Sequence, residues 1–92
     1  MTDAGFLRAL RSVGMAAFVT HLPLFEGSED TATAAERLHL ATGWQPVACR
    51  TRVTYARAIL GAGRRREALE AIAAAGRVDE DVRAMARRLL RS

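Results

Sequence analysis

The residues best suited to chemistry in this sequence are arginines, and they concentrate between Arg37 and Arg66. This stretch contains seven arginines and no carboxylate. A guanidinium group is planar, stays charged at neutral pH and forms paired hydrogen bonds with phosphate oxygens or with the edge of guanine. The net charge of the chain is +4, and residues 47–92 carry the excess, with eleven arginines against five acids. Such a charge distribution suits a polyanion such as nucleic acid.

Two simpler explanations of the arginines stay open at this stage. The chain contains no lysine, and a GC-rich genome produces this bias in a protein that is also rich in alanine. The second explanation is that the arginines form a solvated surface on a packed helix and bind no ligand.

The other reactive side chains form no pattern that supports catalysis or metal binding. Cys49 shares a helix face with Val53, so we expect a buried apolar side chain rather than a nucleophile. His21 and His39 are the only histidines, eighteen residues apart, and no pattern of cysteines or carboxylates at ligand spacing accompanies them. We therefore expect no enzyme activity, no cofactor and no bound metal.

Composition predicts a single helical domain that spans residues 1–92. A chain of this length supports one modest core, and half of its residues are apolar. One cysteine cannot form an internal disulfide, and no apolar run approaches the ~18 residues of a membrane-spanning helix. The N-terminus lacks the cationic start of a secretory signal. We expect an all-α, compact bundle of about five short helices in the cytoplasm, without a membrane segment.

The first helix is predicted to begin at Thr2 or Asp3 and to end near His21. Its end follows from Pro23, because a proline disfavours helical geometry in the residue before it. Residues 23–30 are predicted to form a loop.

The second helix is predicted to begin at a capping box formed by Thr33 and Glu36. Three other residues are rival caps: Ser28, Asp30 and Thr31. Gly43 is suited to end this helix in a left-handed conformation. Pro46 then begins the third helix, because the first helical residue needs no amide hydrogen.

The third helix is predicted over residues 46–60, with one side that packs and one polar side that carries Arg50, Thr54 and Arg57. Glycines end it before a fourth helix over residues 64–75. The last helix is predicted to begin at Asp79.

Residues 33–60 resemble the helix-turn-helix of MerR-type DNA-binding proteins. The matching residues are Leu38, Thr42, Gly43, Pro46 and Arg50. The third helix also resembles the last helix of region four in small sigma factors, with the run Cys49-Arg50-Thr51-Arg52-Val53 and then Ala56-Arg57. The chain departs from these patterns at His39, where they usually hold a small alanine, and at Trp44, where valine or isoleucine is usual.

The resemblance implies a small, non-catalytic transcriptional regulator that uses the 46–60 helix to bind double-stranded DNA. A two-fold dimer is the usual way for so short a module to gain affinity. The residues implied to face DNA are Arg50, Thr51, Thr54 and Arg57. Gln45 is implied to touch a phosphate or a base edge. The implied phosphate contacts are Arg52, Arg64, Arg65 and Arg66.

A second resemblance supports a different function. The spacing inside a tetratricopeptide hairpin is similar to that of Tyr55, Ala56, Ile59, Gly63, Ala68 and Ile72. This resemblance implies an antiparallel helical hairpin over residues 46–75 and a protein–protein interaction module, or adaptor, that grips a protein partner. The two hypotheses differ in whether the partner is DNA or protein.

Overall fold

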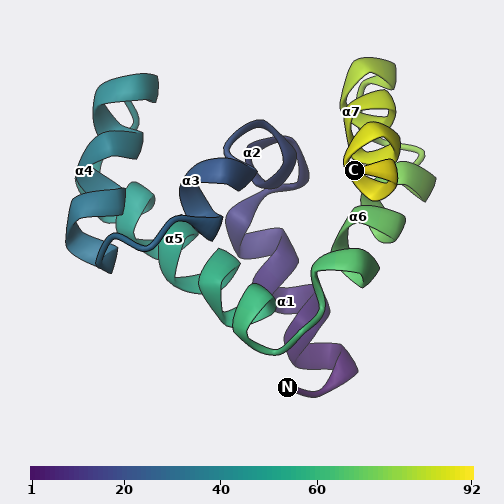
Figure 1. The fold of residues 1–92 in the computed structure, drawn as a ribbon, viewed down its shortest axis with the longest axis horizontal. Coiled ribbons are helices and arrows are strands. Elements are labelled where there is room, and N and C mark those ends of the chain that lie inside the picture. The colour runs from purple at the N-terminus through teal and green to yellow at the C-terminus, as the bar shows by residue number, and fades with distance from the viewer.

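The chain folds into seven α-helices without β-strands in a computed structural model that describes all 92 residues (Figure 1). The helices are α1 (Asp3–Val13), α2 (Met15–Thr20), α3 (Leu22–Glu26), α4 (Thr31–Thr42), α5 (Pro46–Gly61), α6 (Arg65–Ala74) and α7 (Glu80–Arg91). The all-α class is therefore confirmed. The expected number of about five helices is too low, because the first predicted helix is divided and the predicted loop contains a helix.

The first predicted helix is broken at Gly14. This residue has φ 89° and ψ 131°, outside the helical region, and separates α1 from α2. A Cβ atom added to Gly14 would lie 3.0 Å from Nη1 of Arg52. Two features of the break therefore require glycine. One is the positive φ, and the other is the close approach of Arg52 from α5, which leaves little room for a side chain.

The predicted loop over residues 23–30 is wrong in its first half, because residues 22–26 form α3. Pro23 lies in the first turn of this short helix, where its missing amide hydrogen costs no hydrogen bond. Leu22 and Phe25 are buried in the core. Pro23 therefore ends one helix and begins the next, and the two apolar side chains hold the turn against the protein.

The second predicted helix begins earlier than the capping box of Thr33 and Glu36 indicated. Asp30, one of the rival caps, is the N-cap of α4, and its Oδ1 accepts a hydrogen bond of 2.7 Å from the amide of Thr33. This bond holds the pKa of the Asp30 carboxyl below its usual range. The stretch predicted as residues 33–60 therefore corresponds to helices that cover residues 31–61.

The turn between α4 and α5 follows the sequence prediction. Gly43 has the left-handed conformation, with φ 76° and ψ 2°, and donates its amide hydrogen to the carbonyl of His39. Pro46 is the first residue of α5. Glycine and proline thus fix the end of one helix and the start of the next by local backbone preferences.

Helix α5 lies at the centre of the N-terminal part of the fold, where it packs mainly against α1 and α4 and also touches α3. Helix α6 leaves the end of α5 at an angle and pairs with α7, which in turn packs against α2 (Figure 1). The antiparallel hairpin expected over residues 46–75 is therefore wrong, because the partners of α5 and α6 are α4 and α7.

The core consists of 20 buried residues, all apolar. Cys49 and Val53 are fully buried on one side of α5, as predicted, together with Ala56 and Ile59. None of the seven helices combines the length and the apolar character needed to cross a lipid bilayer.

The turn at Gly43 can be tested with a matched pair of glycine substitutions. Gly43→Ala should lower the free energy of unfolding by about 1 kcal/mol, because alanine resists the left-handed conformation. Gly61→Ala should raise it by about 0.5–1 kcal/mol, because Gly61 is helical and alanine favours the helix. Neither added Cβ meets an atom within 4 Å, so backbone preference alone decides whether each substitution raises or lowers the free energy of unfolding. Urea unfolding followed by circular dichroism measures both free energies of unfolding. Equal shifts would contradict the left-handed conformation of Gly43 and the helical conformation of Gly61.

Candidate nucleic-acid interface

Side-chain hydrogen bonds fix the turn that precedes α5. Thr42 donates its hydroxyl hydrogen to the carbonyl of Leu38 over 2.7 Å, and its oxygen accepts from the amide of Trp44 over 3.1 Å. His39 Nδ1 lies 2.6 Å from the carbonyl oxygen of Trp44. Because a carbonyl only accepts, Nδ1 carries the proton. His39 therefore stabilises the turn through a hydrogen bond that alanine, the residue typical of this position in MerR-type helix-turn-helix motifs, could not make.

Trp44 joins this turn to two other parts of the fold. Its ring lies under the guanidinium of Arg52, whose Cζ is 4.4 Å from the ring centroid. The ring of His21, at the junction of α2 and α3, meets it at 81° with the centroids 5.7 Å apart. A valine or isoleucine could not make both contacts, because both require an extended aromatic surface.

The surface of α5 that faces away from the core carries mostly small side chains and no acidic residue. We call Val47, Arg50, Thr51, Thr54 and Ala58 the outer face of α5; all five are exposed. No hydrogen bond or ion pair within the protein engages the side chain of Arg50. Gln45, the N-cap of α5, is also exposed and makes no capping hydrogen bond through its side chain. The outer face can therefore receive a ligand without breaking any internal contact.

Arg52 and Arg57 flank the buried side of α5 and bind backbone carbonyls at the ends of neighbouring helices. Arg52 donates Nη1–H to the carbonyl of Val13, the last residue of α1. Arg57 donates Nε–H to the carbonyl of Phe25 over 3.3 Å and Nη2–H to that of Gly27 over 3.2 Å, at the end of α3. Both arginines act in the fold, although the resemblance implied that they contact DNA.

The arginine run at the start of α6, Arg64 to Arg66, is also mostly engaged within the protein. Arg64 pairs with Asp3 over 3.1 Å, and its guanidinium lies 5.3 Å from the centroid of Phe6. Arg65 donates to Glu26 over 2.8 Å. Arg66 is 74% exposed, and its Nε lies 3.8 Å from Oε2 of Glu70 in a long ion pair on the surface of α6. Arg66 is therefore the most accessible arginine of this run to a phosphate, because its side chain is the most exposed and its single ion pair is long.

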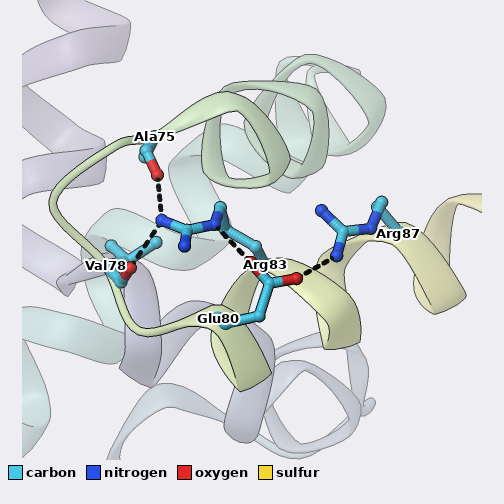
Figure 2. Close-up of polar contacts among 5 residues, drawn as sticks. All are labelled: Ala75, Val78, Glu80, Arg83 and Arg87. Atoms are coloured by element: carbon cyan, nitrogen blue, oxygen red, sulfur yellow. Dashed lines mark hydrogen bonds and ion pairs between the residues drawn. The ribbon is translucent and has the colours of Figure 1, made fainter.

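A further arginine repeats the carbonyl-binding arrangement in the C-terminal helix pair (Figure 2). Arg83 of α7 donates from Nη1 to the carbonyls of Ala75 and Val78, over 2.8 and 2.7 Å. Its Nε–H donates to Glu80 over 3.0 Å, and Arg87 donates to the same carboxylate. These bonds hold the pKa of the Glu80 carboxyl below its usual range. Arg83 thus closes the connection between α6 and α7.

The predicted DNA-facing residues therefore divide into two groups. The exposed group consists of Gln45, Arg50, Thr51, Thr54 and Arg66, and the internally bonded group consists of Arg52, Arg57, Arg64 and Arg65. Arg50, Arg52 and Arg57 make no ion pair with a carboxylate, so α5 keeps a positive field even where its guanidinium groups bind carbonyls.

Two exposed apolar residues near the turn were not identified from the sequence. The exposed fractions are 77% for Leu40 on α4 and 78% for Val47 on α5. The available signal for Val47 was its spacing, because it lies three residues before Arg50 on the same helix. Val47 therefore belongs to the outer face of α5 and not to the core.

Two open hollows border α5, and neither gathers a catalytic or metal-binding set. The hollow between α4 and α5 has a volume of about 210 Å³ and includes Glu36, His39 and Arg50 in its lining. The larger one, about 530 Å³, is bordered by Arg57 and Arg65 together with acidic residues. No three of the histidine, cysteine, aspartate and glutamate side chains come close enough to hold a metal ion.

Comparisons with protein-family models, curated proteins and solved structures find no match for this chain. We therefore infer its function from the side chains and geometry of α4 and α5.

The division of the arginines can be tested by a matched pair of substitutions on α5. Arg52→Met should lower the free energy of unfolding by about 2 kcal/mol, because it removes a charged hydrogen bond to a helix end and the stacking on Trp44. Arg50→Ala should change it by less than about 0.5 kcal/mol, because the side chain is exposed and unbonded. Equal losses in a urea titration would contradict this division.

A second test concerns the pH dependence of stability. Burial lowers the pKa of His21 below its ordinary value of 6.5. The unfolded chain therefore binds the proton more readily, and the free energy of unfolding should decrease as the pH falls below about 6.5. Urea titrations at pH 7.5 and 5.5, followed by the fluorescence of Trp44, measure the difference. His21→Gln should reduce it, and an unchanged difference would remove His21 as its source.

Proposed function

We propose that the chain is a small, non-catalytic regulator that binds double-stranded DNA through the outer face of α5. The observation that carries this proposal is an exposed face on which Arg50, Thr51 and Thr54 have side chains free to bind, on a helix without any carboxylate. A long cation between small hydroxyl-bearing side chains suits the edges of bases in the major groove. The short turn before α5 keeps α4 close behind it, as a helix-turn-helix requires.

The proposed contacts are fewer than those the sequence alone implied. Arg50, Thr51 and Thr54 meet the base edges, Gln45 meets a phosphate or a base at the start of α5, and Arg66 meets a phosphate. Arg52 and Arg57 position the helix by binding the ends of α1 and α3, and Arg64 and Arg65 keep their internal carboxylate partners.

So few phosphate contacts imply weak binding by one copy. Arg66 neutralises one phosphate and the charge of Arg50 lies beside the backbone, so about one or two neutralised phosphates per chain correspond to a salt slope of about −1 to −2 in a double-logarithmic plot. A two-fold homodimer would double the number of contacts and read two half-sites. Dimerisation is therefore part of the proposal.

A protein-interaction function is the second candidate, and the exposure of Leu40 and Val47 favours it. These two apolar side chains flank the turn between α4 and α5 and are each more than three-quarters exposed. Apolar groups so placed bury readily against a protein partner. This version of the adaptor hypothesis uses the α4–α5 turn as its surface.

DNA binding should be measured by fluorescence anisotropy with a labelled duplex pool at several salt concentrations. We expect binding that weakens with salt, with the slope given above for each bound chain. Arg50→Ala should weaken it at least fivefold, because one base contact is worth about 1–3 kcal/mol. Arg88→Ala is the matched control, since it removes the same charge from an exposed position on α7 and should have a much smaller effect.

The outcome separates the two candidate functions. Binding that is absent even at low salt, or equally reduced by both substitutions, would contradict recognition by α5. Recovery of a protein partner that survives Arg50→Ala but is lost on Leu40→Ser would instead support the interaction module.

A further inference from the structure

Val47 is an exposed β-branched residue in the first turn of α5. Its side chain is 78% exposed and takes no part in the apolar core. The residues that share its face are polar or small, and Arg50 lies one turn further along. The two methyl groups of Val47 contact solvent and not the core, so they are available to a ligand.

The outer face of α5 has the length of a short run of base pairs. From Val47 to Thr54 the helix rises about 10 Å, at about 1.5 Å per residue. Three base-pair steps of B-form DNA cover about 10 Å, at about 3.4 Å per step. The apolar methyl groups of Val47 and the guanidinium of Arg50 would then lie over neighbouring base pairs.

The major groove offers a matching partner for each side chain. Guanine presents its O6 and N7 acceptors to an arginine, and thymine is the only base with a methyl group in the groove. Resting on the proposed DNA binding, we infer that α5 reads guanine with Arg50 and that Val47 packs against the C5-methyl group of a neighbouring thymine. Val47 is thus a specificity-determining residue, and the preferred site contains guanine and thymine in adjacent or next-adjacent base pairs.

The inference can be tested by removing single groups from the DNA. A preferred site is first selected from a random duplex pool with the unmodified protein. Each thymine is then replaced by uracil, which lacks only the methyl group, and each guanine by 7-deazaguanine, which lacks the N7 acceptor. One thymine-to-uracil change should weaken binding about threefold to fivefold, as expected for loss of one buried methyl group.

Two variants provide matched controls for the assignment. Val47→Ala should bind thymine and uracil duplexes equally, while remaining sensitive to 7-deazaguanine. Arg50→Ala should show the reverse pattern. Because both side chains are exposed, thermal unfolding of the two variants should match that of the unmodified protein.

The possible results distinguish this inference from the proposed function. Salt-dependent binding without a selected site, or with equal affinity for thymine and uracil at every position, would overturn the reading by Val47 and leave DNA binding intact. A thymine effect that persists in Val47→Ala would also overturn it. Absence of any DNA binding would overturn both, and loss of a protein partner on Val47→Ala would then identify Val47 as part of a protein interface.

Discussion

Hydrogen bonds from arginine side chains to the carbonyl ends of other helices orient the helices of this fold around its apolar core. Every α-helix ends with carbonyls that have no partner within it, and seven helices in 92 residues create many such ends. Arg52, Arg57 and Arg83 reach the ends of α1, α3 and α6. Their charge also interacts favourably with the negative end of each helix dipole. The core is entirely apolar, so these bonds supply the directional contacts that apolar packing lacks.

The geometry of these bonds explains why arginine is needed at these positions. Arg57 contacts two carbonyls through two different nitrogens, and Arg83 contacts two carbonyls and a carboxylate at once. A lysine ammonium lacks the planar fork that reaches several acceptors in fixed directions. Part of the arginine content therefore has a structural cause, and fewer guanidinium groups are free to contact a polyanion directly than the 14 arginines of the sequence suggest.

Local backbone signals were sufficient to predict some elements from the sequence, and contacts between distant residues decided the others. Gly43 and Pro46 act within a few residues of themselves, so the turn before α5 could be predicted. The break at Gly14 depends on the approach of Arg52 from thirty-eight positions further along the chain, and no local pattern contains that information. The same limit applies to the site. Spacing placed Arg50 and Thr54 on an exposed face, but it could not distinguish Arg50 from Arg57, whose acceptors belong to α3.

The carbonyl-binding arginines also determine which residues of α5 meet a partner. Arg52 and Arg57 lie on opposite edges of the buried side of the helix, and each is bonded to the end of a different neighbour. Two such bonds fix the rotation of α5 about its axis, and Trp44 fixes the start of the helix by its contact with Arg52. A rotation of one residue would turn Arg50 by about 100° and remove it from the outer face. The residues that specify the exposed face are therefore largely ones that do not lie on it.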